Sequence, residues 1–384
     1  MSRIRRNYYA RLLILCAVLF LQSFCPIASY AEFDSAAPAA VLMEASTGQI
    51  IYEKNADEAL PPASITKIMT LLLAFDAVEE GRAKWDDEVP ISVKAWKMQG
   101  SKMFLEAGKK IKYIDLVTGI SVVSANDGCI ALAEYLYGTE EAFVKKMNEK
   151  AAQLGLSKTH FENATGLPVE GHKMSAKDIA VLARHLISTY PQILEIESKT
   201  EFTYNNIKQR NRNPLLGAYP GADGLKTGWT EEAGYCLVGT AQQNGMRLIS
   251  VVLNTKNEKD RLFASQQLLN YGFKNFEFFK LKSAGEIVGS VNVKDGKLRE
   301  VGLKVDKDIT VLVKTTDKNK IQFEVKKDHE FLKAPVAEGT RAGKIEALLN
   351  GETIASADVL TAEDVARVGL LTRLIRWFFG LFSK

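Results

Sequence analysis

Three short polar motifs occur along the chain in an order that could build one serine acyl-transfer site. They are Ser64-Ile65-Thr66-Lys67, Ser124-Ala125-Asn126 and Lys226-Thr227-Gly228. Each motif alone would recur by chance, because a serine followed three residues later by a lysine is common on polar helices. All three together, in this order, indicate a nucleophilic serine with basic and hydroxyl partners.

Ser64 and Lys67 have the side chains needed for a nucleophile and its base. Residues 64–80 predict an almost wholly apolar, buried helix. Ser64 is expected at its start, where free backbone N–H groups favour developing negative charge, and Lys67 one turn later on the same face. A lysine can accept the serine proton if its pKa is lowered, and burial together with a second cation, Lys226, would lower it. No histidine stands in a context typical of a serine triad.

The other two motifs supply groups for the rest of an acyl transfer. Ser124 and Asn126 are expected in a loop between two helices, where the hydroxyl can relay a proton and the amide can hold a substrate carbonyl. Lys226-Thr227-Gly228 is expected on a strand at the edge of the cleft, where an extended peptide could pair with the backbone and glycine permits close approach. The N–H groups of Ser64 and Trp229 could form an oxyanion hole.

Each motif also has a purely structural interpretation. Ser64 could cap a helix, Lys67 could be a surface lysine, and residues 124–126 could form an interhelical turn. For any one motif alone the structural interpretation is favoured, but it is improbable for all three motifs together. The four histidines form no His-Glu-x-x-His or comparable cluster, so the sequence does not indicate a metal hydrolase, and neither a metal nor a cofactor is expected.

The hydrophobic pattern predicts an α+β fold in which helices cover an antiparallel sheet. Two β-rich runs joined by a turn predict a hairpin, a block of helical periodicity follows, and three apolar or alternating runs with turns between them predict further antiparallel strands. A closing helix is expected at about 259–271. The other helices are expected at 64–80, 114–123, 127–136, 140–154 and 175–188, and the strands at 39–44, 49–53, 224–229, 235–242 and 246–254.

Changes in composition divide the chain into segments. A basic head, an apolar run and a small-residue cleavage site predict a signal peptide over residues 1–31, with a retained membrane anchor as the alternative. The domain that carries the three motifs is expected over 32–278. Residues 279–360 are rich in Val, Lys and Gly with short alternating runs, which predicts a small all-β domain without a site of its own.

Removal of the signal peptide would change both the charge and the cysteine count. Four arginines leave with it and no acids do, so 46 basic residues balance 46 acidic ones, and the basic pI indicates no nucleic-acid partner. Cys16 and Cys25 leave as well. Cys129 and Cys236 remain in apolar runs, which favours buried free thiols over the one possible disulfide.

The last segment, 361–384, is predicted to be an amphipathic helix with one narrow polar stripe. Arg373 and Arg376 lie on this stripe, and most other positions from 368 to 382 are large and apolar. These fifteen residues are fewer than the roughly twenty that a span requires. We therefore expect the helix to lie in the membrane interface with its arginines toward lipid phosphates; a core helix docked on the body is the alternative.

The motifs and their surroundings resemble one known family over about residues 38–384. This family is the low-molecular-mass penicillin-binding D-alanyl-D-alanine carboxypeptidases of serine peptidase family S11, particularly their Gram-positive sporulation-type branch. The resemblance implies a β-lactamase-like, penicillin-recognising domain, a small β domain and a C-terminal amphipathic anchor. The matching stretches are Pro62–Thr70, Ser124–Asp127, Asn163–Leu167, Gly221–Gly228 and Asp260–Arg261.

The resemblance also implies a role for each site residue. Ser64 would be the acylated nucleophile, Lys67 its base and Ser124 a proton relay. The substrate-binding residues would be Asn126, Lys226, Thr227, Gly228, Trp229 and Arg261, of which Lys226, Thr227 and Arg261 would bind the terminal carboxylate. Two positions depart from the family pattern and could tune rate or antibiotic affinity: Ala125, where many relatives have glycine, and Trp229, where some have histidine.

The implied function is a serine-type D-Ala-D-Ala carboxypeptidase that is exported to the outer face of the cytoplasmic membrane. It would remove the terminal D-alanine from peptidoglycan stem pentapeptides through a Ser64 acyl-enzyme, and β-lactams would acylate it. A β-lactamase is disfavoured because no Glu-x-x-Leu-Asn occurs between Asn126 and Lys226. A penicillin-binding sensor or wall scaffold that acylates without turnover is the other alternative, but the extra spans that usually mark it are not found in the sequence.

Overall fold

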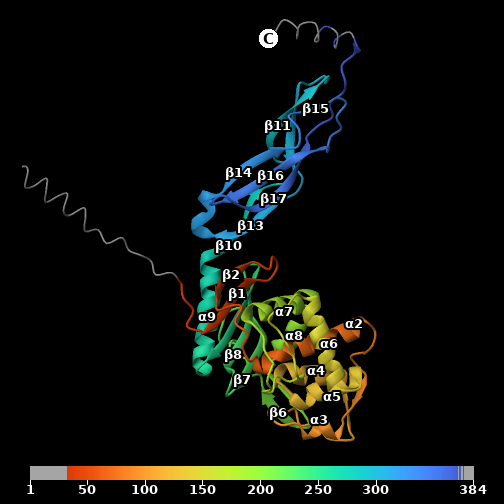
Figure 1. Ribbon diagram of the computed structural model, residues 1–384, viewed down its shortest axis with the longest axis vertical. Coiled ribbons are helices and arrows are strands. Elements are labelled where there is room, and N and C mark those ends of the chain that lie inside the picture. The colour runs from red at the N-terminus through yellow and green to blue at the C-terminus, as the bar shows by residue number, and fades with distance from the viewer. Residues whose placement is uncertain (1–32, 371, 373–374, 376–384) are drawn as a thin grey trace, which may run out of the picture. The chain divides into compact units, whose positions relative to one another are not determined.

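The computed structural model describes residues 33–370, 372 and 375 (Figure 1). The larger domain is built around one antiparallel sheet of five strands in the order β2-β1-β9-β8-β7. The predicted hairpin and the three later strands are all present. β1 pairs with β9 along its whole length, which joins the two groups into one sheet. The strands are β1 (Ala39–Glu44), β2 (Ile50–Lys54), β7 (Ala222–Thr230), β8 (Gly234–Gln243) and β9 (Met246–Thr255).

Helices cover both faces of this sheet because the strands are apolar on both sides. Val41 and Val251 belong to the core that also contains helices α2 and α7. On the other face, Leu42 and Leu248 lie against Gly272 of α9, as the alternation of side chains along a strand requires. The predicted helices are present as α2 (Lys67–Glu79), α4 (Tyr113–Val122), α5 (Asn126–Tyr137), α6 (Glu140–Gln153), α7 (Ala176–Thr189) and α9 (Glu258–Asn275).

Several short elements of this domain were not predicted. Each has only three to five residues, which is too short for a hydrophobic period to stand out. They are β3 (Glu88–Pro90), α3 (Val93–Lys97), β4 (Lys110–Lys112), α8 (Ile193–Glu197), β5 (Glu201–Tyr204) and β6 (Ile207–Arg210). One of them, α8, packs against β7 and α4 and so lies behind the strand that carries the third motif.

The C-terminal domain is all-β, as predicted. Its main sheet has the order β14-β16-β17-β12-β11-β15, and β10 pairs separately with β13. Strands β10, β15 and β17 were not predicted, since β17 in particular has many small and polar residues. The bounds are β10 (Phe276–Lys282), β11 (Ile287–Lys294), β12 (Glu300–Val305), β13 (Ile309–Lys314), β14 (Gln322–Lys327), β15 (Phe331–Lys333), β16 (Arg341–Leu349) and β17 (Glu352–Thr361), with one 3₁₀ turn at Thr315–Lys320.

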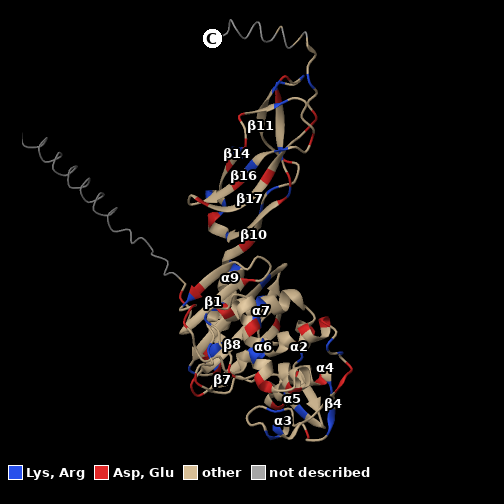
Figure 2. Ribbon diagram, turned by 45° about the vertical axis from the view of Figure 1, so that its right-hand side comes forward, with Lys and Arg blue, Asp and Glu red and all other residues tan. Residues whose placement is uncertain are grey.

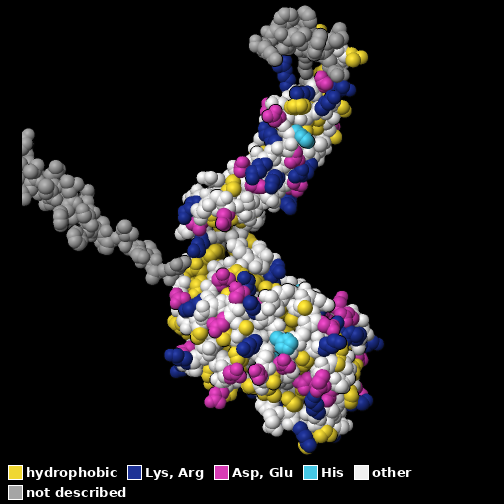
Figure 3. All heavy atoms as spheres, in the orientation of Figure 1, with side chains coloured by type: hydrophobic (Ala, Val, Ile, Leu, Met, Phe, Trp, Pro, Cys, Tyr) yellow, Lys and Arg dark blue, Asp and Glu magenta, His cyan; other side chains and the backbone are white. Residues whose placement is uncertain are grey.

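Charged residues of both signs are mixed along the strands of the C-terminal domain (Figure 2) and over the face of it shown in Figure 3. Several of them form ion pairs across neighbouring strands. Arg341 pairs with Asp358, and Lys326 pairs with the buried carboxylate of Glu346. On the face shown in Figure 3 the two signs alternate, so that face offers no extended patch of one charge to a nucleic acid or an acidic partner.

The predicted tail helix begins later than residue 361, its expected start. Thr361 ends β17, and Val365 is buried and pairs with Val336 through a backbone bridge, so residues 361–369 are not helical. The bulk of the predicted amphipathic helix and the signal peptide both lie outside the described residues. Within the described part of the chain, no helix combines the length and the apolar character needed to cross a membrane.

Candidate active site

Ser64 lies on a short turn that precedes α2 rather than in the α-helix itself. Residues Ala63–Thr66 form a 3₁₀ turn, and the α-helix begins at Lys67. Ala63 has a φ of 48°, which no residue of a right-handed helix adopts, so the chain enters the helix through a tight turn. The helix start predicted at Ser64 is thus three residues too early. Ser64 is partly exposed, whereas Ile65 and Thr66 are buried.

The turn is held from behind by the buried His172. Its Nδ1 accepts a hydrogen bond of 3.1 Å from the backbone N–H of Glu162, so the ring proton is on Nε2, which donates to Thr66 Oγ1 at 2.7 Å. Thr66 Oγ1 in turn donates to Ala63 O at 2.9 Å. Burial lowers the pKa of His172 to about 4, which keeps the ring neutral at pH 7. This chain of hydrogen bonds fixes the turn that carries Ser64.

Gly166 allows a second loop to lie directly against the same turn. Its φ is 83°, and a Cβ at this position would lie 1.8 Å from Ala63 O, so a side chain has no room here. The neighbouring Thr165 O accepts a hydrogen bond of 2.6 Å from Lys67 Nζ. The loop 163–167 therefore forms one wall of the site. In the sequence this loop was visible only as one of the stretches that carry the family resemblance.

Lys67 is fully buried, and its amine joins three segments of the site. Besides Thr165 O, Nζ contacts Ser64 Oγ at 3.0 Å and Asn126 Oδ1 at 2.8 Å. Burial lowers the pKa of Lys67 to about 8. In the neutral amine, two hydrogens can serve Thr165 and Asn126 while the lone pair faces the Ser64 hydroxyl. This geometry suits a base that takes a proton from the serine.

Ser124 and Asn126 reach the site from the start of α5. Ser124 has a φ of 61° and is buried, and within the described residues its hydroxyl has no hydrogen-bond partner. Asn126 begins α5, and both ends of its amide have partners, since Oδ1 accepts from Lys67 and Nδ2 donates to Gln99 O at 2.7 Å. Asn126 therefore orients Lys67, and Ser124 keeps a free hydroxyl.

The third motif lies on a strand, as predicted, and this strand, β7, is at the edge of the sheet. Lys226 is 2% exposed, and Thr227 is buried beside it. A Cβ on Gly228 would lie 2.9 Å from Pro62 O, so glycine lets β7 lie against the turn that carries Ser64. Trp229, by contrast, is 55% exposed. The side chains of β7 are thus buried at Lys226 and exposed to solvent at Trp229.

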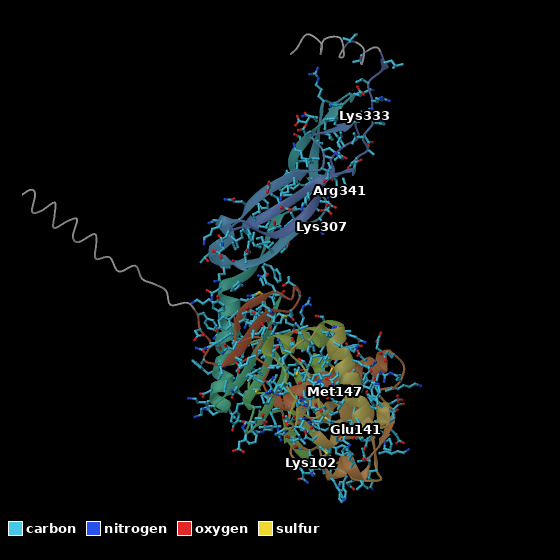
Figure 4. All side chains as sticks on the ribbon, viewed as in Figure 1. Lys102, Glu141, Met147, Lys307, Lys333 and Arg341 are labelled. Atoms are coloured by element: carbon cyan, nitrogen blue, oxygen red, sulfur yellow. The ribbon has the colours of Figure 1, made fainter. Side chains whose placement is uncertain are left out.

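A cavity of about 970 Å³ lies between these elements. Lys67 and Lys226 are buried and are not among the residues that line it, whereas the other residues predicted for the site are. Those lining residues are Ser64, Ser124, Asn126, Thr227, Gly228, Trp229 and Arg261. Ser101 also lines the cavity. The next residue, Lys102, lies at one end of the domain (Figure 4), and its carbonyl oxygen accepts a hydrogen bond from Gln209 Nε2.

Two arginines bring positive charge to the cavity, one predicted and one missed. Arg261 of α9 is buried, lies 5.5 Å from the ring centroid of Tyr235 and donates to Glu258 Oε1 at 3.2 Å. Arg212 is exposed and lines the cavity, and its charge adds to burial in lowering the pKa of Lys67. A single arginine in a polar loop gave no sequence signal, because only the fold brings it to the motifs.

Other expectations concern thiols and metals. Cys129 and Cys236 are buried and not joined in a disulfide, as predicted. Within residues 33–370, 372 and 375, no group of three or more His, Cys, Asp or Glu side chains is arranged to hold a metal ion.

Comparison with known proteins gives the family. Residues 27–257 match the D-alanyl-D-alanine carboxypeptidase family, and residues 276–367 match the C-terminal domain of penicillin-binding protein 5. The carboxypeptidase DacF of Bacillus subtilis is 39% identical over 90% of both chains. Penicillin-binding protein 5 of Haemophilus influenzae is similar in structure, with a TM-score of 0.74 and 36% identity over 88% of this chain and 100% of that one.

A further solved structure is that of a relative with a bound antibiotic. Penicillin-binding protein D2 of Listeria monocytogenes, in its ampicillin-bound form, has a TM-score of 0.58 and 36% identity over 63% of this chain and 99% of that one. The family and the fold therefore both agree with the order of the three motifs. The chain belongs to the low-molecular-mass penicillin-binding proteins and is a serine-type D-alanyl-D-alanine carboxypeptidase.

Proposed function

We propose that Ser64 is the nucleophile and Lys67 its base. Ser64 Oγ attacks the carbonyl carbon of the penultimate D-alanine while Lys67 Nζ takes the hydroxyl proton. The C–N bond then breaks, D-alanine leaves with a proton on its amine, and water hydrolyses the resulting ester and regenerates the serine. The observation that carries this proposal is the 3.0 Å contact between a buried lysine amine and a serine hydroxyl at a cavity wall.

Two further groups assist the departure of D-alanine in this proposal. Ser124 relays the proton to the leaving amine, which its buried and otherwise unpartnered hydroxyl supports. The N–H groups of Ser64 and Trp229 stabilise the oxyanion that forms during both steps. An oxyanion at this position also lies beside the first turn leading into α2, whose free N–H groups favour negative charge.

The substrate we propose is the D-Ala-D-Ala end of a peptidoglycan stem pentapeptide, held as an extended strand along the edge of β7. Lys226, Thr227 and Arg261 bind its terminal carboxylate, and the charge of Arg212 adds to the attraction. β-Lactams acylate the same serine, a proposal supported by the ampicillin-bound and cefotaxime-bound structures of the Listeria relative.

Amidation of the terminal carboxylate tests this recognition. On the wild-type enzyme, the amidated peptide should have a kcat/KM at least about 10²-fold lower than the free acid, because two charge-assisted hydrogen bonds are lost. Arg261→Ala should lower kcat/KM for the acid about tenfold or more and leave the amide almost unaffected. Both values come from D-alanine release with diacetyl-Lys-D-Ala-D-Ala and its amide.

Lys259→Ala is the matched control, since Lys259 is an exposed cation two residues earlier on α9. It should behave as wild type on both peptides. If Arg261→Ala lowers the turnover of acid and amide equally, Arg261 has another role. If the wild-type enzyme treats the two peptides alike, the site does not recognise a carboxylate, and the proposed substrate is wrong.

We further propose where the protein acts. Residues 1–31 direct export and are removed, residues 32–278 carry the activity, and residues 279–360 form most of a spacer to the tail helix, which begins at about residue 370. The tail helix lies in the outer face of the cytoplasmic membrane as a peripheral anchor. The narrow polar stripe with Arg373 and Arg376 supports this location, because large apolar side chains dominate the rest of the segment.

A truncation tests the anchor. Residues 365–368 still form backbone hydrogen bonds with the C-terminal domain, so the deletion should begin at residue 370. The protein without residues 370–384 should move from the membrane fraction to the soluble fraction and keep its activity on small peptides. Reversing both tail arginines to glutamate should weaken binding to anionic vesicles at least about tenfold, since each contributes about 1 kcal/mol near such a surface.

Lys307→Glu with Lys333→Glu is the matched charge reversal. Both residues are exposed in the C-terminal domain (Figure 4), and this double variant should bind vesicles as the wild type does. A truncated protein that stays in the membrane fraction of cells, after removal of the signal peptide, would show that the tail is not the anchor.

A further inference from the structure

Glu197 is a fully buried carboxylate for which the mechanism above has no use. It ends α8 and is 0% exposed, and within the described residues neither carboxylate oxygen has a hydrogen-bond partner. An isolated charge in such a place is very costly, and it persists only beside a charge of opposite sign. The surroundings of Glu197 therefore indicate what it does.

The backbone directs Glu197 toward the lysine of the third motif. A Cβ on Gly224 of β7 would lie 3.4 Å from Glu197 Cβ, so the glutamate packs directly on that strand. Gly224 pairs with Thr240 and Lys226 with Val238 of β8, and because these partners are two residues apart, Gly224 and Lys226 face the same side of the sheet. Lys226 is 2% exposed, and the hydrogen bond of its Nζ goes to Thr227 O at 3.2 Å. Two buried, oppositely charged side chains thus share one side of the strand.

The groups around Lys226 change its pKa in both directions. Lys67 on α2 and Arg212 on the loop before β7 both lower its pKa, as does its own burial, which is the largest cause. Glu197 on α8 and the Cys129 thiol on α5 act in the opposite direction. On Glu197 itself, burial is the largest influence and raises the pKa, while the charge of Lys226 lowers it. Glu197 is the carboxylate in this set.

We propose that Glu197 is a positioning residue of the carboxypeptidase reaction: it is the buried counter-charge that keeps Lys226 cationic for the substrate's terminal carboxylate. This inference rests on the proposed role of Lys226. It explains how two lysines in one cleft perform opposite tasks. Lys67 Nζ contacts three neutral oxygen atoms, whereas Lys226 has a buried carboxylate on its side of β7 that opposes the loss of its proton.

The test is Glu197→Gln, which keeps the shape and removes the charge. KM for diacetyl-Lys-D-Ala-D-Ala should rise about tenfold at pH 8, because a neutral amine holds a carboxylate more weakly, while kcat changes less. The rise of KM with increasing pH should also begin at a lower pH than in the wild type. Glu195→Gln, an exposed glutamate on the same helix, is the matched control and should leave the profile of KM against pH unchanged.

A second measurement tests the inference even if the Glu197→Gln variant alone folds poorly. Lys226→Gln leaves Glu197 without its counter-charge and with a raised pKa in the folded protein. Such a carboxyl favours folding only while it is protonated, so the melting temperature of this variant should fall as pH rises from 6 to 9. Adding Glu197→Gln should remove that pH dependence and raise the melting temperature at pH 9.

The outcomes separate this inference from the proposed function. If Lys226→Gln leaves peptide turnover unchanged, Lys226 does not bind the carboxylate and the proposed function fails at that residue, even if the two stability effects remain coupled. If Glu197→Gln reproduces the KM profile of the Glu195 control, or if the melting temperature of the double variant equals that of Lys226→Gln at pH 9, Glu197 is not the counter-charge and the inference is overturned.

Discussion

Ser64→Ala should abolish both the release of D-alanine and covalent labelling by a fluorescent penicillin. The bond to the acyl group forms at Ser64 Oγ, which Lys67 Nζ contacts at 3.0 Å, whereas the Ser124 hydroxyl has no such contact with the amine among the described residues. The melting temperature should change by no more than a few degrees, because Ser64 is partly exposed and its hydroxyl is one of three partners of Lys67. Gel fluorescence, a D-alanine assay and thermal unfolding measure the three quantities.

Ser157→Ala removes a comparable hydroxyl from an exposed position and serves as the control for Ser64→Ala. It should label and turn over substrate as the wild type does. Persistent labelling of the Ser64 variant, located by peptide mapping to another residue, would mean that the nucleophile has been misassigned.

Lys67→Met should slow acylation by at least about 10²-fold, which is the scale expected when a general base is removed. Methionine keeps much of the apolar volume of the buried chain, so the fold should be retained, although the three hydrogen bonds of the amine are lost. The rate constant for penicillin acylation, from stopped-flow or quenched labelling, measures the loss without interference from deacylation.

The pKa of Lys67 also predicts how the wild-type rate depends on pH. Only the neutral amine accepts a proton, and burial lowers the pKa to about 8, so the acylation rate constant should rise with pH and level off above about 8. An unshifted lysine would place this rise more than two pH units higher. Lys67→Met should show no such rise. A residual rise of the same size in that variant would point to another base.

The helices and strands that follow from patterns among residues close together in the chain could be predicted from the sequence. The apolar run behind Lys67 identified a buried helix, and the alternating runs around Lys226 identified the strand that carries it, because both patterns are repeated over many residues. The three motifs also predicted that the serine, the two lysines and Ser124 would meet. Their types and order allow that inference without a structure, since each is needed for one chemical step.

The parts that depend on tertiary contacts could not be predicted. Arg212 lies in a polar loop and Glu197 at the end of a five-residue helix, and only the packing of α8 and the adjoining loop on β7 gives them a role. His172 likewise acts on Thr66, more than one hundred residues earlier in the chain. The exact start of α2 also depends on such contacts, because the loop with Gly166 and the hydrogen bond from Thr66 hold Ala63 in its unusual conformation.

The uneven burial of β7 bears on how the enzyme selects its substrate. Thr227 and Lys226 are 6% and 2% exposed, whereas Trp229 on the same strand is 55% exposed. If a peptide extends this strand as proposed, its terminal carboxylate is bound where the strand is buried, and the residues that precede it lie toward solvent near Trp229. We therefore expect the terminal residue of the substrate to be selected more strictly than the residues that precede it.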